Sequence, residues 1–329
     1  KGNKMRQQKL GKDRKVSAIG LGCMGMTHAY GKPADRNEMI KLIREAVKLG
    51  CNFFDTAECY IAHNEDGTIE YNEDLVGEAL EPYRDQVVIA TKFGVTHEDR
   101  TIVTDARPET IRKSIEGSLK RLRIDHIDLY YLHRIDPKVP VEEVAQVMKE
   151  LMEEGKITYW GISEADEDSI RRAHAICPIT AVQNRYSMMY RDYEDLFPVL
   201  KELNISLVAF SPLANGILSQ AYSPDSKFDA KDDCCAVMPQ YQKEAFDQNK
   251  QLFDTIRKIA DEKGCTPAQL SLAWMINKED FIIPIPGTTK MHRLKENLEA
   301  GNIELTKEEV ERIDHALDTL PMSGLFGRK

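Results

Sequence analysis

Short runs of apolar, β-branched and aromatic residues recur along the chain and alternate with longer segments whose apolar positions follow a helical period. Eight such runs predict strands, and several are apolar nearly throughout, as expected of strands that are covered on both faces. They occupy residues 16–22, 52–57, 87–93, 127–133, 157–163, 179–185, 206–212 and 281–287.

Amphipathic segments between these runs predict helices. The apolar positions of residues 39–46 and 141–148 follow the i, i+3, i+4, i+7 spacing of a helix with one buried face, and Gly50 and Gly155 follow them as stop signals. A capping-box signal at Thr266 predicts the start of a later helix.

Eight strand–helix units joined mostly by short connections favour a (β/α)8 TIM barrel that takes up the whole chain, residues 1–329, as one domain. A polar turn at residues 10–14 predicts an N-terminal hairpin that closes the bottom of the barrel. An extra C-terminal helix is expected after Thr306. Residues 1–4 precede Met5, a candidate natural start, and are interpreted as a cloning remnant.

Composition excludes several classes of function. The 329 residues include 45 Lys plus Arg and 54 Asp plus Glu, a net charge of −9, which disfavours nucleic acid as a partner. No apolar run approaches the roughly 20 residues that span a bilayer, and the start resembles no signal peptide. The seven cysteines fit neither a disulfide framework nor paired zinc ligands. We expect a cytoplasmic protein without a membrane segment or a metal.

Four polar residues lie at or just beyond the ends of successive predicted strands. Asp55 lies near the end of the second strand with Tyr60 after it, Lys92 lies near the end of the third, and His133 ends the fourth. A barrel places its active site at the C-terminal ends of its strands, so these side chains are expected to share one mouth. Taken singly, Asp55 and Lys92 would suit a buried ion pair and His133 a core histidine. Their combination favours a site.

At these residues the chain resembles the aldo-keto reductase superfamily. The motifs FFDTAECY, ATKFG, YYLHR, GISEA, AVQNRYS, VAFSPLANGIL and IPGTTKMHRLKENL are similar to its landmarks and occur in the same order, from about Met5 to Leu320. Near the start, LGCMGM resembles the branch that contains the auxin-induced-like plant reductases and their bacterial relatives. The potassium-channel β-subunits are similar but more distant. The resemblance implies NADPH-dependent reduction of aldehydes and ketones to alcohols.

The resemblance also implies a catalytic tetrad of Asp55, Tyr60, Lys92 and His133. Carbonyl reduction builds negative charge on the substrate oxygen, so Tyr60 would donate a proton there as general acid. The Lys92 ammonium is expected to lower the pKa of that phenol, and Asp55 to keep Lys92 charged and placed. His133 would orient the carbonyl with a hydrogen bond to its oxygen.

The cofactor implied by the resemblance is NADP(H), with NAD(H) as the alternative. Ser163 and Gln183 would hold the carboxamide and Phe210 would stack on the nicotinamide. Thr288, Lys290 and Arg293 could bind a 2′-phosphate, which favours NADP. The full implied set is Gly22, Cys23, Met24, Asp55, Ser163, Gln183, Phe210, Ser211, Pro212, Leu213, Gly216, Gly287, Thr288, Thr289, Lys290, Arg293, Glu296 and Asn297.

Three positions depart from the family pattern. Glu164 stands where many members have Asn beside the carboxamide, and Gly287 replaces a Lys that other branches carry. Ile61 follows Tyr60 where Gly is usual, and the longer loop that follows leaves Tyr71 as a second candidate proton donor.

The substrate itself is not specified by the sequence, because specificity in barrels lies in the loops. The relevant loops are 26–34, 58–72, 94–106 and 213–243, together with the tail after Leu320. The second and fourth are long enough to be functional or mobile. The residues expected to line the pocket are Met24, Tyr30, Tyr186 and Phe326.

Gly20, Gly22 and Gly25 imitate the glycine fingerprint of a Rossmann fold. That fingerprint needs a helix to begin at once, whereas the next helix is expected only near Asp35, so we reject it.

Two further motifs also have simpler interpretations. Residues 62–73 partly match a calcium loop, but Ala62 occupies the first ligand position, and a solvated acidic loop is the better interpretation. Cys234 and Cys235 are expected to be free thiols, with a redox switch as a guess.

Two other functions remain as alternatives. One is a cofactor-loaded sensor similar to the channel β-subunits, with slow turnover, although a pure sensor has no need for Tyr60. The other is a barrel isomerase that uses Lys92 as a Schiff base. In the favoured interpretation the partner is a small carbonyl compound and the protein is a monomer or a weak homo-oligomer.

Overall fold

The computed structural model describes residues 5–98, 101–231 and 233–328, so the expected remnant at 1–4 lies outside it. Eight parallel strands form one sheet in the order β14-β13-β12-β11-β10-β7-β4-β3. Their bounds are β3 Leu21–Gly22, β4 Phe53–Asp55, β7 Val88–Phe93, β10 Ile127–Leu132, β11 Ile157–Ser163, β12 Ala181–Arg185, β13 Ser206–Phe210 and β14 Ile282–Pro284.

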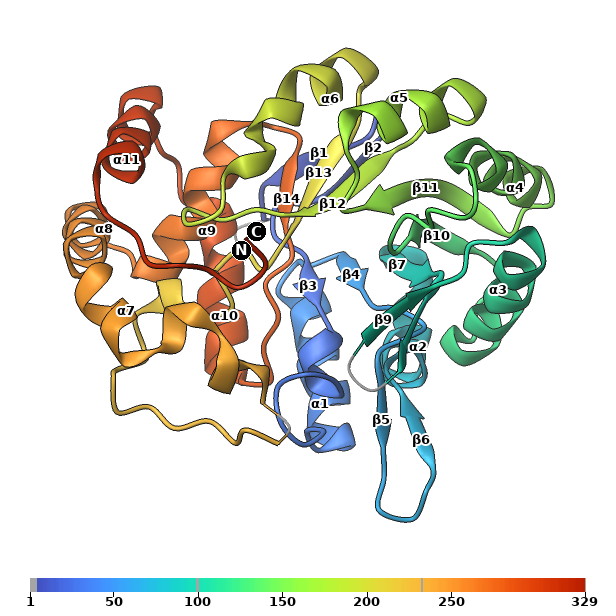
Figure 1. Cartoon of the computed structure of the whole chain (residues 1–329), viewed down its shortest axis with the longest axis horizontal. Coiled ribbons are helices and arrows are strands. Elements are labelled where there is room, and N and C mark those ends of the chain that lie inside the picture. The colour runs from blue at the N-terminus through green and yellow to red at the C-terminus, as the bar shows by residue number, and fades with distance from the viewer. Residues whose placement is uncertain (1–4, 99–100, 232, 329) are drawn as a thin grey trace.

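Helices surround this sheet on the outside (Figure 1). Within the described ranges, none of them is long and apolar enough to cross a bilayer. Their bounds are α1 Arg36–Lys48, α2 Asn72–Leu80, α3 Pro108–Leu122, α4 Val141–Glu153, α5 Glu167–Ile176, α6 Phe197–Leu203, α7 Lys243–Gln248, α8 Lys250–Lys263, α9 Pro267–Lys278, α10 Met291–Glu299 and α11 Lys307–Thr319.

The predicted helix signals are confirmed. α1 begins after Asp35, whose carboxylate accepts a hydrogen bond from the backbone N–H of Glu38 at 2.9 Å. Thr266 begins α9 and Thr306 begins α11, each with a complete capping box. Only a one-turn 3₁₀ helix, Met24–Met26, follows β3, and the first α-helix begins at Arg36, so the rejection of the Rossmann fingerprint is also confirmed.

The predicted N-terminal hairpin consists of β1 (Gln7–Leu10) and β2 (Arg14–Ser17). Gly11 N–H donates to Ser206 Oγ at 2.8 Å, at the start of β13, so the hairpin closes the N-terminal end of the barrel. The prediction of a single strand over residues 16–22 is wrong. Residues 16 and 17 end β2 of the N-terminal hairpin, and residues 21 and 22 form β3 of the barrel. The chain bends between them because the two strands belong to different sheets.

Alternate positions of the strands point into the barrel and fill it with apolar side chains. Phe53, Ala90, Tyr131, Ala181 and Val208 belong to one buried cluster, which Leu10 and Val16 of the hairpin complete. The intervening positions pack against the helices, as strands covered on both faces require.

Two glycines close the ring between its first and last strands. Gly22 pairs with Gly287 in a parallel bridge, and Gly20 N–H donates to the carbonyl of Pro284 at 2.9 Å. A Cβ on Gly22 would lie 2.7 Å from the Ile285 carbonyl oxygen, and one on Gly287 would lie 2.8 Å from the Gly22 oxygen. Only glycine allows the two backbones to approach this closely.

Two of the loops at the mouth contain strand pairs that the sequence did not predict. Residues 58–72 include the hairpin β5 (Ile61–His63) and β6 (Ile69–Tyr71), which projects from the edge of the molecule (Figure 1). Residues 94–106 include the hairpin β8 (Val95–Glu98) and β9 (Thr101–Thr104).

Substitution of Gly22 by alanine tests the closure. The new methyl group must displace backbone, so we expect a loss of about 1–3 kcal/mol in the free energy of unfolding, measured by urea denaturation. Gly324→Ala is the control, because its methyl would meet Pro239 at an ordinary 3.4 Å. Equal stability of the Gly22→Ala variant and wild type would contradict the role given to this contact.

Candidate active site

The Lys92 side chain lies at the centre of the site and is completely buried. Its ammonium forms an ion pair with Asp55 and donates to the Thr56 carbonyl at 2.8 Å and to the Tyr60 hydroxyl at 3.1 Å. Asp55 in turn accepts a 2.7 Å hydrogen bond from the Gln183 amide. The structure therefore brings together three predicted catalytic residues and one predicted cofactor residue.

Burial and the ion pair act in opposite directions on the charges of Asp55 and Lys92. Burial raises the pKa of Asp55, and the Lys92 ammonium and the Gln183 amide oppose that rise. Burial disfavours the ammonium of Lys92, but the charge of Asp55, the Tyr60 oxygen and the hydrogen bonds to both together outweigh burial and leave the pKa of Lys92 above its ordinary value. Lys92 is therefore protonated at neutral pH.

Tyr60 departs from the sequence prediction in one respect. Burial raises the pKa of its phenol, and the charge of Lys92 lowers it without cancelling the effect of burial. The expected contribution of Lys92 is present, but the prediction of a net lowered pKa is wrong, because the sequence gives no measure of how completely the ring is buried.

His133 lies across from Tyr60, with the two rings edge to face at 5.8 Å. Burial, reinforced by the charges of Lys92 and Arg134, holds the pKa of His133 well below its ordinary value, so its imidazole is neutral. Its Nδ1 lies 3.4 Å from the Cys59 thiol. Burial raises the pKa of that thiol to about 12, so Cys59 keeps its proton. A thiol that donates to Nδ1 leaves the imidazole N–H on Nε2.

Asn72, the first residue of α2, supports the site from behind. Its side-chain oxygen accepts from the Thr56 hydroxyl at 2.6 Å, and its amide donates to the Cys23 carbonyl at 2.8 Å. It thereby fixes the segment whose carbonyl receives Lys92 and the turn after β3. This role of Asn72 was not predicted from the sequence, although an Asn at the start of a helix beside a predicted site residue could have indicated it.

The mouth also carries basic and imidazole side chains that the sequence analysis missed. The His28 ring stacks near Tyr60 at 5.9 Å and lies 5.3 Å from the ring of His97. Arg134 and Arg185 lie 6.0 and 5.0 Å from the centre of the Phe210 ring. Arg134 and Arg185 lie at or just after the ends of barrel strands, and His28 and His97 lie in loops at the mouth. Their positions relative to the strand ends could have indicated them from the sequence.

The predicted carboxamide residues lie side by side on neighbouring strands. Ser163 is paired with Gln183, and both are buried. The Ser163 hydroxyl accepts from Arg134 at 2.9 Å. Glu164, which stands where many family members have Asn, accepts from the backbone N–H of Arg185 at 3.1 Å and from the Tyr193 hydroxyl at 2.9 Å. Its carboxylate therefore holds Arg185 and Tyr193 in place beside the mouth.

The predicted pyrophosphate loop has a strained backbone. Ser211, Ala214, Asn215 and Gly216 all have positive φ, at 49°, 52°, 60° and 101°. Such clusters of left-handed residues turn successive N–H groups toward one concave side and are frequent at anion sites.

The predicted adenosine residues follow β14. Lys290 precedes α10 and is exposed, and no side chain caps the N–H groups of that helix start. Arg293, on the first turn of α10, lies 3.9 Å from Glu296. Open N–H groups beside two cations form a site suited to a phosphate. Gly22 and Gly287 lie between this region and the tetrad. The rest of the predicted cofactor set lies on the segments that follow β3, β13 and β14: Cys23, Met24, Pro212, Leu213, Thr288, Thr289 and Asn297.

Two expected residues lie elsewhere. The prediction that Tyr186 lines the pocket is wrong, because its ring is fully buried and stacks on Trp274 at 5.5 Å. Tyr71, the second candidate proton donor, lies under Arg121, whose guanidinium is 4.5 Å from the ring centre.

Residues 62–71 lie in the β5–β6 hairpin, and residues 72 and 73 begin α2. The expectation of a solvated acidic loop is wrong for Glu73, which is fully buried and accepts from Arg121 at 2.7 Å. Asp66, one of the acidic positions, accepts from the backbone N–H and the hydroxyl of Thr68, at 2.9 and 2.6 Å. These bonds use the carboxylate to shape the turn, as the interpretation of a solvated acidic loop allows.

The comparisons with known proteins agree with this geometry. The model of the aldo/keto reductase family matches residues 18–318. A probable aldo-keto reductase from Glycine max is 40% identical over 312 residues, which cover 94% of this chain and 88% of that protein. Among solved structures, a glycerol dehydrogenase from Gluconobacter oxydans is similar with a TM-score of 0.85 and 26% identity over 98% of each chain. The holo form of an aldo-keto reductase from Bacillus halodurans has a TM-score of 0.76 and 26% identity over 98% of this chain and 99% of that one.

Substitution of Lys92 by methionine tests the buried ion pair. At neutral pH we expect a loss of about 3–5 kcal/mol in the free energy of unfolding, because the Asp55 charge is left buried without a partner. In this variant the folded-state pKa of Asp55 lies above its unfolded value. Stability is therefore greatest at low pH and falls as the pH rises through the folded-state pKa.

Urea denaturation across a pH series measures both effects. The Lys92→Met/Asp55→Asn double variant is the control, and it should regain part of the loss and show a weaker pH dependence. A loss in the single variant that stays the same at every pH would contradict the charged pair.

Proposed function

Since the chain belongs to the aldo/keto reductase family, we propose that it is an NADPH-dependent oxidoreductase that reduces small aldehydes or ketones to alcohols. The observation that carries this proposal is the buried Tyr60 phenol 3.1 Å from the Lys92 ammonium, with a neutral His133 beside it. A proton donor, a fixed positive charge and a hydrogen-bond donor then surround one point at the mouth.

The residues present fit a nicotinamide dinucleotide. The uncapped start of α10, with Lys290 and Arg293, suits the phosphate of the adenosine end. The left-handed residues Ser211 and Ala214–Gly216 suit the pyrophosphate, and Phe210 offers a ring for stacking. The cofactor supplies the hydride when bound.

The side chains of the tetrad divide the remaining work. The Tyr60 hydroxyl donates its proton to the carbonyl oxygen of the substrate as negative charge develops there. The Lys92 ammonium stabilises the phenolate that remains, and Asp55 keeps the ammonium in place. The N–H that His133 retains donates a hydrogen bond to the same oxygen and orients the carbonyl.

The Schiff-base alternative fits less well. Attack on a carbonyl requires a neutral amine, whereas the ion pair with Asp55 raises the pKa of Lys92 and keeps it protonated. The sensor alternative is a barrel that binds the cofactor but turns over slowly. Tight NADPH binding without measurable turnover of carbonyl compounds would favour it over the reductase.

The cellular setting completes the proposal. The seven cysteines are all free thiols, which is consistent with a reducing cytoplasm. We place the protein there as one barrel domain, a monomer or a weak homo-oligomer.

Substitution of Tyr60 by phenylalanine tests the proton donor. The change removes one hydroxyl and keeps the ring, so we expect NADPH affinity to persist while kcat falls by about 100- to 10,000-fold. Fluorescence titration measures binding, and NADPH oxidation across a panel of aldehydes and ketones measures turnover. Tyr71→Phe is the matched control and should retain activity. Unchanged turnover in Tyr60→Phe would refute the assignment.

Substitution of Arg293 by alanine tests the preference for NADP(H). Loss of a charged hydrogen bond of about 1.5–3 kcal/mol should weaken NADPH binding by about 10- to 150-fold and leave NADH binding nearly unchanged. Fluorescence titration with both nucleotides measures this ratio. Lys295→Ala, an exposed lysine of the same helix, is the control. An equal effect on the two nucleotides would show that Arg293 does not bind a 2′-phosphate.

A further inference from the structure

Residues 220–231 and 233–242, here called the strap, lie between the Ser211–Gly216 loop and α7. An aromatic cluster gives it a small core of its own: Tyr241 lies edge to face with Tyr222 and Phe228, at 5.2 and 4.9 Å between ring centres. The Tyr241 hydroxyl donates to the Asn215 carbonyl at 2.7 Å. The strap is thereby attached to the predicted pyrophosphate loop.

The strap also contacts the loop after β3. Asp233 forms an antiparallel bridge with Tyr30, and Cys234 N–H donates to the Ala29 carbonyl at 3.0 Å. The Tyr30 hydroxyl accepts from the Asn215 amide at 2.8 Å. Three segments that are far apart in sequence therefore meet at one junction beside the mouth.

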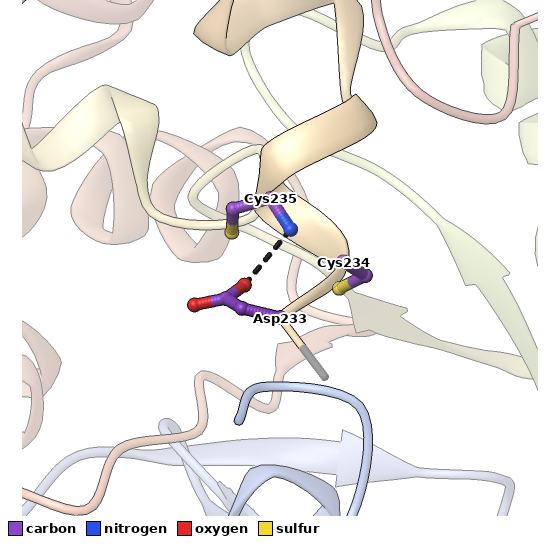
Figure 2. A group of neighbouring side chains, drawn as sticks. All are labelled: Asp233, Cys234 and Cys235. Carbon is purple, nitrogen blue, oxygen red and sulfur yellow. Dashed lines mark hydrogen bonds between the residues drawn. The ribbon is translucent and has the colours of Figure 1, made fainter. Parts of the chain in front are cut away.

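Three potential metal ligands lie together at this junction (Figure 2). One ligand atom from each of Asp233, Cys234 and Cys235 lies within 4.8 Å of the other two. The Asp233 carboxylate accepts a 2.9 Å hydrogen bond from Cys235 N–H, which fixes it beside the turn that carries the two thiols. Within the part of the chain that the structure describes, no lysine or arginine forms an ion pair with Asp233.

The arrangement suits a shared ion better than a disulfide. Cys234 and Cys235 are consecutive residues of a 3₁₀ helix, Cys234–Val237, and consecutive helical side chains diverge. A disulfide needs Cβ atoms about 3.8 Å apart, so its formation would disrupt this turn. A tetrahedral ion with metal–sulfur bonds of about 2.3 Å needs its two sulfur atoms only about 3.8 Å apart, which small rotations of the existing side chains can provide.

We propose that Asp233, Cys234 and Cys235 form a site for one thiophilic divalent cation, of the zinc or cadmium type, with two sulfur ligands and one oxygen ligand. The fourth tetrahedral position is open to water or a small ligand. Each thiol releases its proton to solvent as its sulfur binds, so binding strengthens as the pH rises.

The bound ion would fix the junction. Asp233 and Cys234 carry the backbone contacts to Tyr30 and Ala29, so an ion bound by Asp233, Cys234 and Cys235 would fix the turn that makes these contacts. Metal binding should therefore slow hydrogen exchange in the strap. This effect does not depend on the proposed reductase activity.

Cadmium titration of the full, reduced chain tests the site, with the ultraviolet charge-transfer band of cadmium thiolate as the readout. We expect the band to saturate at one ion per chain, to be lost in Cys234→Ser/Cys235→Ser, and to be displaced by zinc. Asp233→Asn should weaken binding by about tenfold or more. Circular dichroism and NADPH titration check that each variant is folded.

Two control variants separate this site from other thiols. Cys265→Ser removes a half-buried cysteine at the start of α9, and Cys59→Ser removes the thiol beside His133. Both should retain the band. Absence of the band in the reduced wild type, or its persistence in the double variant, would overturn the proposal.

Discussion

Closure of the parallel sheet is the constraint on which the rest of the structure depends. The first strand of the ring, β3, is only two residues long, and it meets β14 through backbone contacts that leave no room for a Cβ at Gly22 or Gly287. Once the ring closes, the C-terminal ends of all eight strands face one mouth. Asp55, on the strand beside β3, then faces Gln183 across the barrel although 128 positions separate them.

The proposed catalytic positions on the strands continue their inward-facing series. Asp55 lies two residues after Phe53, and His133 two after Tyr131, on strands whose earlier inward positions are apolar. Because side chains alternate with a period of two, a polar residue in this series must point into the barrel. The sequence could therefore predict the barrel and the meeting of the tetrad, since both follow from periodicity and from where each strand ends.

Features that depend on contacts between distant segments could not be predicted in this way. Residues 16–22 have the pattern of one strand, but they belong to two sheets, the N-terminal hairpin and the barrel. The hydrogen bond from Gly11 to Ser206 holds the hairpin at the N-terminal end of the barrel, and no local pattern predicts it. Tyr186 follows a strand end like the site residues, yet it packs on Trp274. The basic wall of the mouth, with Arg185 over Phe210, depends on rotamers and loop geometry that no local pattern specifies.

The raised pKa of Tyr60 shows why the sign of an electrostatic effect needs the folded structure. Burial holds the proton on the phenol, which suits the role proposed for Tyr60, because a general acid must carry its proton before it reacts. The Lys92 ammonium, 3.1 Å away, interacts weakly with a neutral hydroxyl and strongly with a phenolate. Its stabilisation therefore grows as the proton leaves and is greatest where charge develops. A neutral His133 adds a donor without adding a charge that would repel the ammonium.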